Sequence, residues 1–121
     1  MIDHTGVGVS DIERSKAFYR AALAPLGYRV IMEWQQHAGL GVPPKPDFWI
    51  GAGTPSKPPL HVCFRAESRQ QVDLFYAAAL LAGGRDNGPP GLRPHYHANY
   101  YGAFVLDPDG HNIEAVCHAP A

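Results

Sequence analysis

Residues 4–27, HTGVGVSDIERSKAFYRAALAPLG, and residues 61–84, HVCFRAESRQQVDLFYAAALLAGG, are two versions of one segment. Shifting the first forward by 57 positions aligns seven identical residues in 24, where about one or two are expected by chance. The matches include His4 with His61 and the Phe-Tyr pair of each segment. Such internal repetition indicates a fold built from two copies of one supersecondary unit.

Each copy begins as a short strand and continues as a helix. Ser10 and Glu13 form a Ser-x-x-Glu pattern, in which the serine accepts from an early helical N–H and the glutamate reaches back. Ser68 and Gln71 form the glutamine version of this capping box. Apolar residues at helical spacing follow each start, and Pro or Gly residues close each segment. Two helices are therefore expected, over about residues 11–24 and 68–82.

Three further strand candidates follow each helix, so each half reads βαβββ and the fold class is α+β. The eight strands are predicted at residues 2–9, 28–34, 37–42, 47–52, 60–66, 85–88, 100–106 and 112–118. We expect one domain made of module 1 (about 1–53), a Pro- and Gly-containing linker (about 54–58) and module 2 (about 59–121). The second half also contains an aperiodic insertion at 88–99, and a loop of that length in a small domain is often functional.

The composition is that of an ordinary globular chain. With 121 residues, 45% hydrophobic and 17% charged, it can bury one core and is not compositionally disordered. A net charge of −1 provides no basic surface for nucleic acid or anionic membrane, and no apolar run is long enough for a membrane span. We expect no signal peptide and a cytoplasmic protein, in which Cys63 and Cys117 are buried free thiols.

Two of the seven histidines hold equivalent positions near the start of each module's first strand. Strand side chains alternate between faces, so His4 and His61 point away from the helices if Val7 and Phe64 pack against them. The last strand alternates likewise and directs Glu114 to the helix-free side. Parity therefore predicts that His4, His61 and Glu114 share the open face.

A carboxylate among apolar residues of a central strand needs a partner. One solution is a divalent metal held by His4, His61 and Glu114, since two imidazoles and a carboxylate with open positions suit Fe(II), Mn(II), Ni(II) or Zn(II). The other is a salt bridge from Glu114 to Arg65, and residue types alone do not separate the two. Trp49 aligns with Glu114 in the first module, so a fourth ligand is missing there, and the indole is a candidate to wall the cavity or stack on a ligand.

The insertion supplies the remaining candidates. Arg93, His97 and Tyr100 are candidates to reach over the open face and contact a substrate, since loops on rigid scaffolds often supply such groups. The alternative is an exposed polar loop without such a role. The turn at 107–111, Asp-Pro-Asp-Gly-His, is expected to leave His111 exposed.

Three features combine into a recognisable pattern. They are the paired βαβββ modules with an opening histidine, Ser-Asp-Ile-Glu-Arg-Ser-x-Ala-Phe-Tyr at 10–19, and Leu-Asp-Pro-Asp-Gly-His-Asn-Ile-Glu at 106–114. Over essentially its whole length the chain resembles the vicinal oxygen chelate superfamily, which includes glyoxalase I, extradiol dioxygenases, fosfomycin-modifying enzymes and bleomycin-binding proteins. The resemblance implies an eight-stranded, incompletely closed cup with helices outside.

The resemblance also implies a metal held on the inner face by His4, His61 and Glu114. Members of this kind are often dimers whose modules pair across chains, so His4 of one copy is a candidate to join the other two ligands on a partner. The sequence does not choose between that pairing and a site within one chain. Glyoxalase I typically supplies a fourth ligand where this chain has Trp49, which argues against lactoylglutathione lyase activity.

Two functions follow from the residues and the resemblance. The first is a metal-dependent lyase, dioxygenase or transferase, in which one Fe, Mn, Ni, Co or Zn ion chelates neighbouring oxygens of a small substrate and stabilises an oxyanion. Tyr100, His97 or Glu114 would handle protons there. The second is a metal-free protein, similar to the bleomycin-sequestering members, that holds a planar or apolar ligand between aromatics such as Trp34 and Trp49. The expected partners are a small molecule and a second copy of the chain, with no nucleic acid or membrane.

Overall fold

The computed structural model describes all 121 residues and contains the βαβββ unit twice. The first module comprises β1 (Thr5–Val9), α1 (Ile12–Leu23), the short 3-10 helix η1 (Ala24–Leu26), β2 (Arg29–Trp34), β3 (His37–Gly41) and β4 (Phe48–Ala52). The second comprises β5 (His61–Arg65), α2 (Arg69–Leu81), β6 (Arg85–Leu92), β7 (Tyr101–Leu106) and β8 (Asn112–Cys117). The predicted α+β class and order of elements are confirmed.

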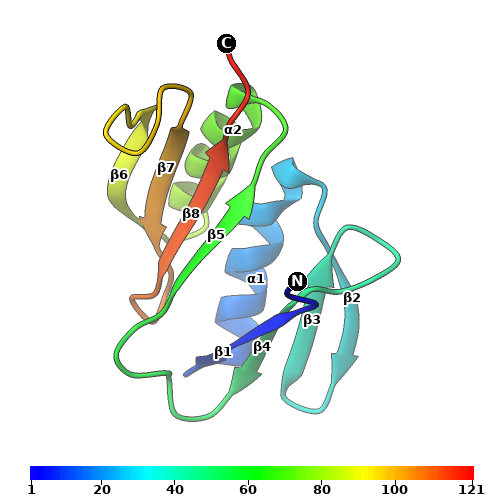
Figure 1. Cartoon of the computed structure of the whole chain (residues 1–121). Helices are drawn as coiled ribbons and strands as arrows, with labels where there is room; N and C mark the ends of the chain where they lie inside the picture. The colour runs from blue at the N-terminus through cyan, green and yellow to red at the C-terminus, as the bar shows by residue number, and fades with distance from the viewer.

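Each module forms its own four-stranded sheet (Figure 1). The strand orders are β1-β4-β3-β2 and β5-β8-β7-β6. The first strand of each module runs parallel to the last, and the remaining neighbours are antiparallel. The two sheets are not joined into a closed barrel, which agrees with the predicted open arrangement. As a result β1 and β5 are edge strands. His4 directly precedes β1, and His61 is the first residue of β5.

The helices cover one face of each sheet and meet each other. Helix α1 packs on β2, β3 and β4, helix α2 packs on β6, β7 and β8, and α1 contacts α2. The repeated Phe18 and Phe75 are 1% and 0% exposed, and Val7 and Phe64 are buried on the helix side of the edge strands. Twenty buried residues form one continuous apolar cluster. No helix is long and apolar enough to cross a membrane.

The two helix starts differ from each other. Asp11, and not Ser10, caps α1 by accepting from the N–H three residues later at 3.1 Å. The backbone N–H of Ser10 donates instead to Asp109 of the other module at 3.1 Å. Ser68 caps α2 as predicted, because its hydroxyl accepts from the N–H of Gln71 at 3.1 Å.

Strand β6 occupies part of the predicted insertion. It extends to Leu92 and includes Pro89 and Pro90, so the irregular segment is shortened to residues 93–100. Proline has no backbone N–H to donate. Because β6 is an edge strand, it has no neighbouring strand on its free side and needs no such donor there.

The turn at 107–111 is a buried connection between the modules. His111 is 0% exposed; its Nδ1 accepts from the N–H of Leu60 and its Nε2 donates to the carbonyl of Gly8, both at 3.0 Å. Buried Asp107 accepts from the Tyr19 hydroxyl and from the N–H of His111. The expectation of an exposed His111 is wrong, because module 1 covers this turn and the imidazole satisfies two backbone groups there.

Both cysteines are free, but they lie in different environments. Cys117 is buried as expected. The expectation of burial is wrong for Cys63, which is exposed because it lies on the open face of an edge strand.

Candidate active site

The open face of the second sheet brings together residues from three strands. Cys63 of β5 lies opposite Glu114 of β8, and Phe104 of β7 lies on the other side of Glu114. Directly paired residues point to the same face, so these side chains are neighbours. The Glu114 side chain is 2% exposed, whereas that of His61 is 53% exposed. The carboxylate therefore lies at the base of the site and the imidazole at its opening.

Both oxygens of Glu114 have hydrogen-bonding partners. Oε1 lies 2.8 Å from Nε2 of His61, and Oε2 accepts from the hydroxyl of Tyr100. The alternative salt bridge between Glu114 and Arg65 is not formed. Two partners offset much of the cost of burying the carboxylate.

The neighbours of Glu114 keep their protons at neutral pH. Burial, followed by the hydrogen bond and charge of Glu114, raises the pKa of Tyr100 above its ordinary value near 10. Burial, followed by the charge of Glu114, raises the pKa of Cys63 to about 12. Tyr100 is therefore a donor to the carboxylate, and Cys63 contributes an uncharged thiol rather than a thiolate ligand.

Gly102 makes room for the contact between tyrosine and carboxylate. A Cβ at this position would lie 3.2 Å from the Tyr100 ring and 3.4 Å from Oε2 of Glu114. With glycine at position 102, Tyr100 and Glu114 can keep their positions. A glycine inside a strand often marks the close approach of another group, and this is the only sequence signal that could have indicated the contact between Tyr100 and Glu114.

The other candidates from the irregular segment lie around this site. Arg93 is fixed against its own strand, with hydrogen bonds to the carbonyls of Pro89 and Gly91 at 2.8 and 2.9 Å and its guanidinium 5.4 Å from the ring centre of Phe104. It therefore borders the open face without extending across it. His97 lies farther along the segment.

His4 does not join this cluster within the chain. Its Nδ1 lies 2.7 Å from Oδ1 of Asp3, which also accepts from Lys45 at 2.9 Å. The His4 side chain is 59% exposed. No group of three or more His, Cys, Asp or Glu side chains is arranged to hold a metal ion in the single chain. The structure thus brings His61, Glu114 and Tyr100 together and leaves His4 at the edge of the other sheet.

The pair of His61 and Glu114 fits two of the three ligands of a two-histidine, one-carboxylate metal site. Ligand atoms bound to one ion at about 2.0–2.2 Å stand about 3 Å apart, since their bonds diverge by about a right angle or more. Nε2 of His61 and Oε1 of Glu114 are 2.8 Å apart, and the histidine side is open to solvent.

The corresponding face of the first sheet is aromatic and uncharged. The indole of Trp49 covers Gly39, where a Cβ would lie 2.8 Å from the ring, and His37 covers Gly51 at the same distance. A cavity of about 350 Å³ borders both rings, and no Lys, Arg, Asp or Glu lines it. This face can contact a planar ligand but holds no carboxylate for a metal.

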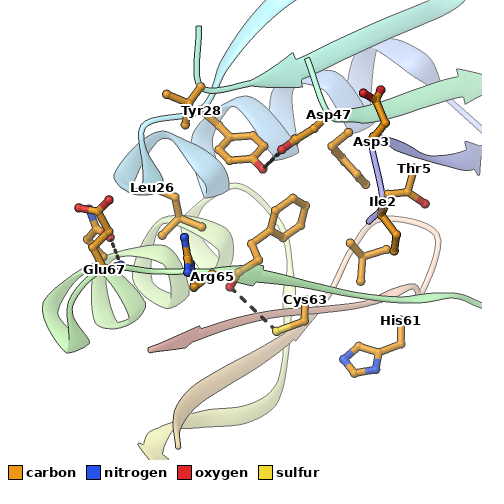
Figure 2. Close-up of a pocket in the computed structure, with 15 residues that line it drawn as sticks. Ile2, Asp3, Thr5, Leu26, Tyr28, Asp47, His61, Cys63, Arg65 and Glu67 are labelled. Atoms are coloured by element: carbon orange, nitrogen blue, oxygen red, sulfur yellow. Dashed lines mark hydrogen bonds between the residues drawn. The ribbon is translucent and has the colours of Figure 1, made fainter. Parts of the chain in front are cut away.

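A larger cavity of about 600 Å³ lies between the modules (Figure 2). His61, Cys63 and Arg65 of β5 line one side, and Tyr28, hydrogen-bonded to Asp47 at 2.8 Å, lines another. His61 therefore borders both this cavity and the open face.

Comparison with known proteins places these features in a family context. The model of the Glyoxalase/Bleomycin resistance protein/Dioxygenase superfamily matches residues 1–115. The crystal structure of a glyoxalase/bleomycin resistance protein from Albidiferax ferrireducens T118 is 33% identical, with a TM-score of 0.82 over 94% of this chain and 96% of that one. No curated protein matches.

Two more distant structures share the fold. A glyoxalase/bleomycin resistance protein/dioxygenase family enzyme from Burkholderia phytofirmans PsJN is 20% identical, with a TM-score of 0.76 and 98% of both chains covered. Lactoylglutathione lyase from Agrobacterium tumefaciens is 17% identical, with a TM-score of 0.69, covering 97% of this chain and 92% of that chain.

Proposed function

Because the chain belongs to the Glyoxalase/Bleomycin resistance protein/Dioxygenase superfamily, we propose that it is a metal-dependent enzyme acting on a small oxygen-bearing substrate. The activities open to it are those of a lyase, a dioxygenase or a transferase. One observation carries the proposal: a partly exposed imidazole and a buried carboxylate present Nε2 and Oε1 2.8 Å apart on one sheet face. His61 and Glu114 are the proposed ligands on this chain.

His4 of a second copy is the proposed third ligand. His4 precedes edge strand β1 and His61 begins edge strand β5, and a free edge is a ready surface for another chain. Within one chain the only hydrogen bond of the His4 ring is with exposed Asp3, an interaction of the kind that contributes little to stability. His4 is therefore free to exchange this contact for a ligand position in a homodimer.

A divalent ion bound by these residues supplies Lewis-acid chemistry toward neighbouring substrate oxygens. Tyr100 holds its proton on Oη and, by donating to Oε2 of Glu114, orients the carboxylate so that Oε1 faces His61. A neutral His61 would bind the ion through Nε2 with its single proton on Nδ1, so its hydrogen bond to Glu114 would be replaced by the two ligand bonds. Arg93, which lies over the Phe104 ring, and Trp49, on the aromatic face of module 1, are the proposed substrate contacts.

Metal content tests the proposal directly. Protein purified without a histidine tag is expected to bind about one Fe, Mn, Ni, Co or Zn ion per chain. Glu114→Ala and His61→Ala are expected to weaken binding by at least about tenfold. His95→Ala removes an exposed histidine that makes no hydrogen bond and is the matched control. A wild-type protein that neither retains nor rebinds a stoichiometric ion would rule out the enzyme.

A mixed dimer tests the origin of the third ligand. Co-expression of differently tagged His4→Ala and His61→Ala chains, followed by cleavage of the tags, allows the heterodimer to be isolated, in which one site receives His4 from one chain and His61 from the other. This heterodimer is expected to hold half of the wild-type metal content, although each variant alone binds little. If the mixed dimer also binds little, His4 does not act across chains.

The aromatic face of module 1 favours a second candidate, a metal-free protein that binds planar ligands. The supporting observation is the uncharged cavity beside Trp49 and His37. Gly6 lines this cavity and has room for a Cβ, which would meet nothing closer than 3.9 Å, so Gly6→Phe is expected to direct its ring into the cavity. Quenching of tryptophan fluorescence by catechol in metal-stripped protein is expected to need at least about tenfold more ligand in Gly6→Phe, with Gly6→Ala as control. Equal quenching in all three proteins would dismiss this candidate.

A further inference from the structure

A separate cavity, of about 510 Å³, lies between α1 and β2 in module 1. Three of its lining residues are cationic, Lys16, Arg20 and Arg29, and one is acidic, Glu33. Lys16 and Arg20 are about one helical turn apart on α1, and Arg29 is the first residue of β2. The cavity shares no residue with the proposed metal site.

The carboxylates near this cavity are already engaged by Lys16. Its Nζ lies 2.6 Å from Oε1 of Glu33 and 3.1 Å from Oε2 of Glu13. The hydrogen bond between Lys16 and Glu33 raises the pKa of the amine and lowers that of the carboxyl, so both groups are charged at neutral pH. Neither Arg20 nor Arg29 forms an ion pair with any acidic residue. Two guanidinium groups thus line the cavity without an anionic partner of their own.

The helix itself does not require these cations. A cation near the carbonyl end of a helix is stabilising, and Arg20 lies in the last turn of α1. However, α2 has Ala77 at the equivalent position and no basic residue in its last turn. Lys16 likewise corresponds to Asp73 in the second copy. The cations are therefore a feature of module 1 and not of the repeated βαβββ unit.

The chemistry of the two arginines favours a phosphate group. A guanidinium can donate two parallel N–H bonds to a phosphate, and a doubly charged phosphate has enough oxygens to accept from two such groups. Ligand sites typically measure about 300–1,000 Å³, so this cavity has room for a small molecule attached to the phosphate. Ala24 and Val30 provide apolar lining for that part of the ligand.

We propose that this cavity binds a small phosphate monoester, with Arg20 and Arg29 as the ligands of the phosphate and the apolar lining as the contact of the organic group. Lys16 neutralises Glu33, the one carboxylate in the lining, and so reduces its repulsion of the phosphate. The site uses neither His61 nor Glu114. It therefore goes beyond the proposed function and does not depend on it.

Calorimetry of metal-stripped protein with phenyl phosphate tests the site. The metal is removed because a phosphate would also bind an ion held by His61 and Glu114. The wild type is expected to bind phenyl phosphate more tightly than inorganic phosphate, because the ring contacts the apolar lining. Arg20→Gln and Arg29→Gln are each expected to weaken binding by at least about tenfold. Arg20→Lys keeps the charge without the paired donors and should weaken it less than Arg20→Gln.

The matched control is Arg14→Gln, which removes an exposed arginine of α1 that does not line the cavity. It should keep the wild-type affinity, whereas nonspecific attraction by surface charge would weaken equally in all three glutamine variants. Thermal unfolding without ligand checks that each variant is folded. Failure of the wild type to bind phenyl phosphate, or equal affinities of Arg14→Gln and Arg20→Gln, would overturn the site. Because no metal is present, neither result bears on whether His61 and Glu114 bind an ion.

Discussion

The two open sheet faces descend from the same βαβββ pattern and differ in chemistry. The second presents Glu114, hydrogen-bonded to His61 and Tyr100, whereas the first presents Trp49 over Gly39 at the aligned place. The second face thus offers the imidazole and carboxylate of the proposed metal site, whereas the first offers an aromatic surface without a carboxylate.

The helix-facing sides of the same strands are much more alike. Phe18 and Phe75 occupy equivalent positions and are both buried, as are Ala22 and Ala79. A tightly packed interior penalises changes of even one methylene, whereas a side chain on an open face has solvent on one side and fewer neighbours to restrict it. The two copies agree where packing restricts the residue and differ where the solvent-facing side is free to acquire a function.

The largest expected effect on stability comes from removing the His111 side chain, which joins the two modules. His111→Ala removes the partners of the Leu60 N–H and the Gly8 carbonyl and leaves a cavity in their place. A loss of about 3 kcal/mol in the free energy of unfolding is expected. Urea denaturation measures it, with exposed His95→Ala as the control that should change little. A loss below about 1 kcal/mol would mean that the buried turn does not hold the modules together.

A smaller loss of stability is expected from a substitution on the aromatic face of module 1. Gly39→Ala places a Cβ 2.8 Å from the Trp49 indole, so the ring must move, at a cost of about 1–3 kcal/mol. Gly6→Ala on the same face meets nothing closer than 3.9 Å and should be neutral or slightly stabilising. Urea midpoints and tryptophan emission of the two variants give the comparison. If both variants behave alike, the indole is not held against Gly39.

The contrast between the faces also shows which features a sequence can predict. The repeat, the order of strands and the cap of α2 by Ser68 depend on local patterns, and these predictions agree with the structure. The pairing of Glu114 with Tyr100 depends on the room left by Gly102, which becomes evident only once β7 and β8 are in register. Burial of His111 depends on Gly8, 103 positions earlier, and no local pattern contains that contact.

Two other differences have equally specific causes. The extension of β6 through Pro89 and Pro90 is possible because β6 lies at a sheet edge, which strand propensity alone does not predict. The cap of α1 is Asp11 rather than Ser10, whose backbone N–H donates to Asp109 in the other module. The first difference thus depends on the place of β6 in its own sheet, and the second occurs at a contact between the modules.

The repeated tyrosines allow a pH test of how differently the copies are packed. Tyr19 is fully buried, and burial, followed by the charge of Asp107, raises its pKa well above 10. The folded protein keeps this proton after the unfolded chain has lost it. The stabilisation of the folded state by neutral Tyr19 is therefore complete below about pH 10. It is lost as the pH rises above 10, by up to about 1.4 kcal/mol of unfolding free energy per pH unit.

Urea midpoints between pH 9 and 11 measure this slope. Tyr19→Phe should flatten it, at the cost of lower stability at pH 8 from the lost hydrogen bond to Asp107. Tyr76→Phe, at the equivalent position of module 2, is the matched control, because Tyr76 is only partly buried and bonds to exposed Asp86. Equal slopes in both variants would show that Tyr19 does not dominate the alkaline response.

The smallest expected effect is a change of reaction rate at Cys63, with little change in stability. Cys63 is exposed, yet its pKa of about 12 leaves it protonated at pH 8, because it is partly desolvated and faces Glu114. Only about one ten-thousandth of the thiol is then thiolate, so alkylation by iodoacetamide should be far slower than for free cysteine. Glu114→Gln removes the negative charge but keeps the shape of the side chain, and should accelerate alkylation several-fold while buried Cys117 stays unreactive in the folded protein. An unchanged rate would mean that partial desolvation alone raises the pKa of Cys63, whereas a faster rate would mean that Glu114 on the same open face contributes to it.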